Sequence, residues 1–169
     1  MFKSMFIAAL SLIATQHVAH ADYDRESLTR MLSETIKTGH YVGVFDGENV
    51  DIGVGEIEHY PGIFKISVIT GGNSPGTYTF YTLYQSPFYD NELQDVVVEA
   101  NRVSLKYTHF EHPLQFVRKW IDMTHDGSGQ LSEVRVTSRQ WPYESRTSAI
   151  TGMRRISSEN PLQRWHPRD

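Results

Sequence analysis

The segment from Asp122 to Glu133 carries oxygen-bearing side chains at the spacing of a calcium loop. Counted as such a loop, Asp122, Thr124 and Asp126 take positions 1, 3 and 5, Gly127 takes position 6 and Glu133 takes position 12. A hard cation prefers alternate oxygens, a glycine at the sharp bend and a closing carboxylate. The same residues suit a β-hairpin turn, because Asp and Gly tolerate unusual backbone angles. We expect the hairpin turn, with a Ca²⁺ site as the alternative.

Two histidines and a glutamate lie within four residues, at His109, Glu111 and His112. Imidazole is a preferred ligand of Zn²⁺, and a catalytic zinc site needs three protein ligands. A strand precedes this segment and Pro113 follows it, so we expect an exposed loop. A metal-dependent hydrolase that uses His109, His112 or Asp126 is a further hypothesis. We rank this hypothesis below a ligand-binding role and a protein-docking role.

A third group joins aromatic rings with one cation. Phe116, Arg118 and Trp120 alternate along an expected strand, so they share one of its faces. If that face points inward, the rings line a cavity and Arg118 holds the carboxylate of a small apolar or amphipathic ligand. The alternative is a filled core with the arginine at the rim. The expected ligand-binding residues are Tyr78, Phe80, Tyr107, Phe116, Arg118 and Trp120.

One helix is expected before the strands, over residues 24–38. Asp24 suits the N-cap, and Gly39 suits the left-handed position after the last turn. The apolar residues of this helix recur every three or four positions and form one stripe: Leu28, Met31, Leu32 and Ile36. A helix with one apolar face has to lie on another element.

Beyond Gly39 the hydrophobic period changes to two, and turn residues recur every 10 to 15 positions. This pattern predicts eight or nine short strands with no helices between them, and therefore an antiparallel meander. We expect an up-and-down β-barrel, with a β-sandwich as the alternative. The domain would cover residues 22–156 and leave a polar tail at residues 157–169.

The start of the first strand, Gly39-His40-Tyr41, resembles the Gly-x-Trp motif of lipocalins and related calycins, with Tyr in place of Trp. The resemblance implies a ligand-binding barrel. It also implies that an arginine from a late strand packs on the aromatic ring at the base of the barrel. Arg118 or Arg135 would take that part here.

The N-terminal residues have the order of a secretory signal peptide. Lys3 is followed by an apolar run over residues 5–14 and by the small-x-small site Ala19-His20-Ala21. The run is shorter than the roughly 20 residues that span a bilayer. We expect cleavage near Ala21 and a periplasmic or secreted protein.

The composition narrows the function further. The chain has no cysteine, which excludes a thiolate site, and its net charge of −4 makes nucleic acid a poor partner. No other apolar run is long enough for a membrane span. The first expectation is a small-molecule binder without a resident cofactor. The alternative is a module that docks on an envelope protein through the loops Gly71–Gly76 or Ser86–Asn91. The sequence leaves the oligomeric state open.

Overall fold

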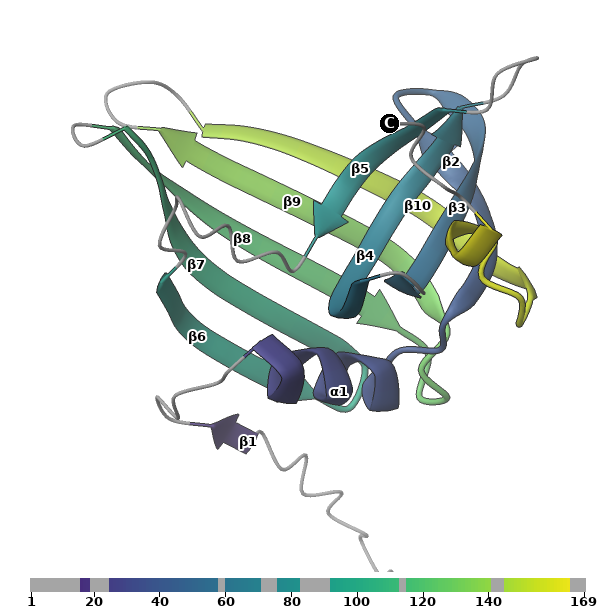
Figure 1. Ribbon diagram of the computed structural model, residues 1–169, viewed down its shortest axis with the longest axis horizontal. Coiled ribbons are helices and arrows are strands. Elements are labelled where there is room, and N and C mark those ends of the chain that lie inside the picture. Colours follow the sequence, from purple (N-terminus) through teal and green to yellow (C-terminus); the bar gives the residue numbers. More distant parts are fainter. Residues whose placement is uncertain are drawn as a thin grey trace, which may run out of the picture.

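One antiparallel sheet that curls around one α-helix makes up the part of the chain that the structure describes (Figure 1). The structure is a computed structural model of the 169-residue chain. It describes the backbone of residues 16–18, 25–57, 60–70, 76–82, 92–112, 115–140 and 145–164. Side chains are described for residues 27–56, 64–69, 95–106, 117–139 and 145–162.

The elements follow the chain in a simple order. They are β1 (Gln16–Val18), α1 (Arg25–Thr35), β2 (Gly39–Phe45), β3 (Glu48–Ile57), β4 (Tyr60–Thr70), β5 (Gly76–Thr82), β6 (Glu92–Glu99), β7 (Arg102–His112), β8 (Gln115–His125), β9 (Leu131–Gln140), β10 (Ser145–Ser157) and the 3₁₀ turn η1 (Pro161–Arg164). None of the described helices is long and apolar enough to cross a bilayer.

The strand order in the sheet is β1-β6-β7-β8-β9-β10-β2-β3-β4-β5, with antiparallel pairing throughout. The last strand, β10, returns to pair with β2, so the nine described strands after the helix keep the cyclic order of a meander. β5 lies at one end of this order, and β6, flanked by β1, lies at the other. The expected all-β meander is confirmed as a single curled sheet of half-barrel shape.

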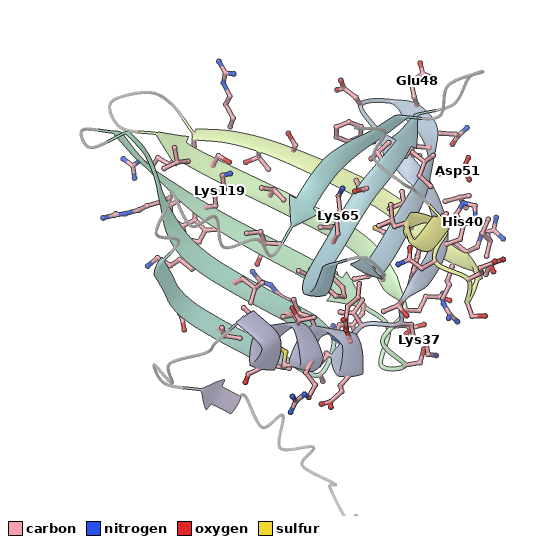
Figure 2. The ribbon with its side chains drawn as sticks, in the orientation of Figure 1. Lys37, His40, Glu48, Asp51, Lys65 and Lys119 are labelled. Atoms are coloured by element: carbon pink, nitrogen blue, oxygen red, sulfur yellow. The ribbon has the colours of Figure 1, made fainter. Side chains whose placement is uncertain are left out.

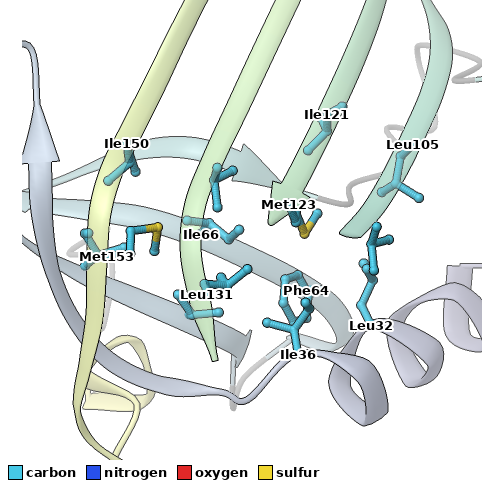
Figure 3. Packing of buried hydrophobic residues seen from close by; sticks show 14 of the residues in the cluster. Leu32, Ile36, Phe64, Ile66, Leu105, Ile121, Met123, Leu131, Ile150 and Met153 are labelled. Atoms are coloured by element: carbon cyan, nitrogen blue, oxygen red, sulfur yellow. The ribbon is translucent and has the colours of Figure 1, made fainter. Parts of the chain in front are cut away.

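Helix α1 lies across the open end of the curl and packs on β4 and β3 (Figure 1). Its apolar stripe is buried, with Leu28, Leu32 and Ile36 each no more than 2% exposed. Figure 3 shows Leu32 and Ile36 beside Phe64, among apolar side chains from both halves of the sheet. The expected amphipathic helix is confirmed, because burial of this stripe is what places it.

The end of the helix differs from the prediction. The helix ends at Thr35, four residues before Gly39, and Gly39 begins β2. Gly39 has a φ of +143° and its Cα lies against the carbonyl oxygen of Ser157, so a side chain there would strike β10. Glycine is therefore required for close strand contact and not for a helix cap. The expected N-cap, Asp24, lies outside the described residues.

The two ends of the chain carry more structure than the prediction allowed. Gln16–Val18, inside the expected signal segment, pairs with β6. In the expected polar tail, Asn160 and Leu162 are buried, and Asn160 donates its side-chain amide to the carbonyl of Glu56 at 3.0 Å. Leu162 packs on Gly53 of β3, where any larger residue would collide with it.

Candidate functional site

The concave face of β6 to β10 changes from apolar to cationic with distance from α1. Residues directly opposite each other in an antiparallel sheet share a face, so the register defines rows across the strands. The row next to the helix is Val98, Val103, Met123, Val134 and Ile150. The second row is Val96, Leu105, Ile121, Val136 and Ser148. The third row is Leu93, Tyr107, Lys119, Ser138 and Arg146.

Burial follows the same gradient. Val103, Met123, Val134 and Ile150 of the first row are fully buried. In the second row, Val136 is half-buried and Ser148 is exposed, although Leu105 and Ile121 stay buried. The first row therefore lies inside the apolar core, together with Leu32, Ile36 and Phe64, and burial decreases from the second row outward.

The third row supplies the charges of this face. Lys119 and Ser138 lie opposite each other on β8 and β9, and Arg146 lies opposite Ser138 on β10. Lys119 and Ser138 are half-buried and Arg146 is exposed. Figure 2 shows Lys119 on the broad part of the sheet, well away from α1. The arrangement places two cations and a hydroxyl at the outer end of an apolar surface.

The sequence assigned the charged role to the neighbouring residue, and the structure corrects it. Val117 and Ile121 are buried on the concave face, and Lys119, which lies between them at alternate positions, shares that face. Arg118 and Trp120 therefore lie on the opposite, outer face. Arg118 is exposed and Trp120 is half-buried there. Because side chains alternate along a strand, an error of one residue moves a whole set to the other face.

The other four expected ligand-binding residues are placed only by their backbone register. Tyr107 lies opposite Lys119 in the third row, and Tyr78 on β5 lies opposite Val68 on β4. Phe116 lies opposite Phe110. Phe80 lies at the irregularity between β4 and β5. Their side chains lie outside the described residues, so their role stays a prediction.

The four oxygen ligands expected for Ca²⁺ are spread over two strands and a turn. Asp122 and Thr124 lie on β8, Glu133 lies opposite Thr124 on β9, and Asp126 lies in the turn between the strands. The segment is a β-hairpin, as the favoured interpretation expected. Among the described side chains, no three His, Asp or Glu groups are placed to hold a metal ion.

The two strand carboxylates have separate protein partners. Arg102 donates to Oδ1 of Asp122 through Nε, at 3.1 Å, and through Nη2, and the Ser104 hydroxyl donates to the same oxygen at 2.7 Å. Arg135 donates to Glu133 from Nε at 3.0 Å. Both carboxylates therefore join ion pairs on the outer face instead of converging on a cation.

Asp126 organises the hairpin turn. Its Oδ1 accepts hydrogen bonds from the hydroxyl of Ser128 at 2.6 Å and from the backbone N–H groups of Ser128 and Gln130, each at 3.0 Å. These bonds, that of the Ser128 side chain first, hold the pKa of the Asp126 carboxyl below its ordinary value. The turn also contacts the segment that follows the helix, because the Gly129 carbonyl accepts a hydrogen bond from the Lys37 N–H at 2.8 Å.

The histidine segment is a strand, and the expected loop is wrong. His109 and His112 both belong to β7, where they lie opposite Val117 and Gln115 of β8. The ladder with β8 continues to this point, and Pro113 comes only after the last strand residue. The side chains of both histidines lie outside the described residues. Most residues of the two loops expected to dock on a protein, Gly71–Gly76 and Ser86–Asn91, also lie outside them.

Sequence reasoning missed the arginine at the base of the curl. Arg155 on β10 lies opposite Tyr41 on β2, and its Nε donates to the carbonyl of Thr38 at 2.9 Å. Tyr41 is fully buried and donates its hydroxyl to the carbonyl of Lys37 at 2.6 Å. Burial raises the pKa of the Tyr41 phenol. The register thus places Arg155 opposite Tyr41, whereas Arg118 and Arg135, which the resemblance proposed, are exposed on other strands.

Comparison of the chain with protein-family models, with curated proteins and with solved structures gives no match.

Proposed function

We propose that the protein binds a small amphipathic molecule with an anionic headgroup on the concave face of β6 to β10. The observation that carries this proposal is the order of the three rows. Apolar side chains cover the part next to α1, and Lys119, Ser138 and Arg146 lie at the outer end. An elongated ligand would bury its apolar part against Val136, which is partly exposed, and place its headgroup at the cations.

The chemistry of the third row favours a carboxylate over a neutral or cationic headgroup. The Lys119 ammonium and the Arg146 guanidinium are donors without acceptor capacity, and the Ser138 hydroxyl between them donates as well. A carboxylate accepts charge-assisted hydrogen bonds from such donors. An ammonium headgroup would be repelled by the same two cations.

The apolar part of the ligand supplies most of the binding free energy. Burial of a methylene group contributes about 0.8 kcal/mol, whereas a partly exposed ion pair contributes about 1 kcal/mol or less. The rows therefore predict that the length of the ligand's alkyl chain determines the affinity and that its headgroup determines the orientation of the bound ligand. Loss of one cation should weaken binding without abolishing it.

Titration calorimetry with decanoate, decan-1-ol and decyltrimethylammonium tests the proposal. The wild-type chain should bind decanoate more tightly than decanol and should bind the cationic probe most weakly. Lys119→Gln should raise the Kd for decanoate about three- to tenfold and leave the Kd for decanol unchanged. If the wild-type chain binds neither decanoate nor decanol, the proposal is wrong.

Arg118→Gln is the matched control. Arg118 is the next residue of the same strand, also cationic, and it lies on the outer face. Its replacement should leave the Kd for decanoate unchanged. Equal losses in the two variants would indicate a general effect of net charge and would contradict a site on the concave face.

Export supports this role and is itself part of the proposal. The expected signal segment would bring the protein into the periplasm or outside the cell. A carrier or scavenger of amphipathic molecules would act in that compartment, because such molecules enter and leave the membranes that border it. The support comes from residues 1–21 of the sequence.

A further inference from the structure

A separate groove lies on the outer face of the sheet, across β6 to β9. It has a volume of about 370 Å³ and, apart from the buried Leu105, is lined by residues that alternate with those of the concave face. Leu105 and Ile121 point into the core, whereas Lys106 and Trp120, their neighbours along the chain, lie at the groove. The sheet itself therefore separates this groove from the proposed amphiphile site.

Trp120 is the aromatic residue that lines the groove. One row of the outer face runs from Asp95 through Lys106 and Trp120 to Thr137. Trp120 is half-buried, so part of its indole is open to solvent with polar side chains on either side. An open aromatic face among hydrogen-bonding groups suits a ligand that has both C–H surface and hydroxyl groups.

A hydrogen-bonded polar cluster also lines the groove. Ser104 and Arg102 both donate to Oδ1 of Asp122, and these bonds hold the carboxylate in one orientation. The Asp122 side chain is 27% exposed and that of Arg102 is 48% exposed, so both can also be reached by a ligand. These three hydrogen bonds all go to Oδ1, so none of them occupies Oδ2 of Asp122. This oxygen is an acceptor held in place beside the indole.

The charges in the groove balance. Asp95 and Asp122 oppose Arg102 and Lys106, so the lining has no net charge. A phosphate or carboxylate ligand would meet two carboxylates, and a cation would meet two basic groups. A neutral ligand that donates and accepts many hydrogen bonds is matched by both kinds of group.

We propose that this groove is a binding site for a neutral saccharide. A sugar ring would lay its C–H face on the Trp120 indole. Its hydroxyl groups would donate to Asp122 and Asp95 and accept from Arg102 and Lys106. The volume lies at the small end of the range for small-molecule sites, which suits a short stretch of glycan.

Saturation-transfer NMR on the full chain with cello-, malto- and chito-oligosaccharides of three to six units tests this site. At least one series should bind, and Trp120→Ala should raise its Kd about tenfold or more, while Trp120→Phe, which keeps an aromatic face, should lose less. Asp95→Asn replaces an exposed carboxylate without changing its size, so it should raise the same Kd several-fold in a fully folded protein.

The controls separate this site from the concave face. Lys119→Gln should leave the saccharide Kd unchanged, and Trp120→Ala should leave the decanoate Kd unchanged. If no series binds the wild-type chain, or if the Trp120→Ala and Asp95→Asn variants bind as tightly as the wild type, the proposal is wrong.

Discussion

The side chain of Arg155 reaches the carbonyl oxygen of Thr38 at 2.9 Å and so joins the last strand to the segment that leads from α1 into β2. The same segment is held from two further directions. Tyr41 donates its hydroxyl to Lys37, and Gly129 of the β8–β9 turn accepts the Lys37 N–H. β10, β2 and the β8–β9 turn thus hold the segment between α1 and β2 in place.

Replacement of Arg155 should loosen this junction. Arg155→Gln removes the donor to Thr38 and leaves a half-buried carbonyl without that partner, so the free energy of unfolding should fall by about 1–2 kcal/mol. Arg154→Gln is the control, because Arg154 is exposed on the other face of β10. Urea denaturation of both variants measures the difference. An equal change in the two would contradict a specific role for Arg155.

Two glycines of one turn should respond differently to the same substitution. Gly129 has a φ of +86°, and a Cβ there would lie 2.5 Å from the carbonyl oxygen of Thr35, so Gly129→Ala should cost about 1–3 kcal/mol. A Cβ on Gly127 meets nothing within 4 Å. Gly127→Ala should therefore leave the free energy of unfolding nearly unchanged. Thermal unfolding of the pair checks this, and similar melting temperatures would show that the turn does not dock on α1 as described.

The stabilising effect of Asp126 should disappear in acid. Its pKa is lower in the folded chain than the ordinary value of 3.8, so the ionised carboxylate stabilises the fold above that value. This contribution is lost as the pH falls through the lower, folded pKa. Asp126→Asn should therefore be less stable than the wild type near pH 7, and the gap should narrow below about pH 4. A gap that stays constant from pH 7 into this acid range would rule out the linkage.

Cleavage near Ala21 should change one edge of the sheet. It would remove β1, which pairs with β6 at Val96, Val97 and Val98, and so expose part of the β6 edge. Backbone amides of these three residues that point toward β1 should exchange with solvent faster in the 22–169 chain than in the full chain. Hydrogen exchange measured by NMR gives the comparison. Equal rates would show that β1 does not protect this edge.

Local patterns are enough to predict the helix, the succession of strands and the class of fold, although not every boundary. The apolar stripe of α1 needs only the helical period, and the strands need only alternation and turn residues. The predicted face of β8 is wrong because Phe116 and Trp120 have large rings, which suggest a buried side. The continuation of the strand gives the opposite answer, because Ile121 and Met123 are apolar and Asp122 and Thr124 are polar.

The rest of the site depends on contacts between distant residues. Lys119, Ser138 and Arg146 form one row only because the β8–β9 and β9–β10 hairpins set that register. Arg155 meets Thr38 across 117 positions, and no local pattern marks it among the other arginines of β10. A glycine after an apolar stripe locally indicates a helix cap, which is why the cap is predicted at Gly39. Its actual neighbour is Ser157, at the other end of the domain.

The most direct test of the central claim is a set of nuclear Overhauser effects between bound decanoate and the side chains of β8 and β9. The proposed site predicts contacts from the terminal methyl group of the ligand to Val136, and contacts from the carbon next to the carboxylate to Lys119. It predicts none to Trp120. Contacts to Trp120 with none to Val136 would place the ligand on the outer face and contradict the account.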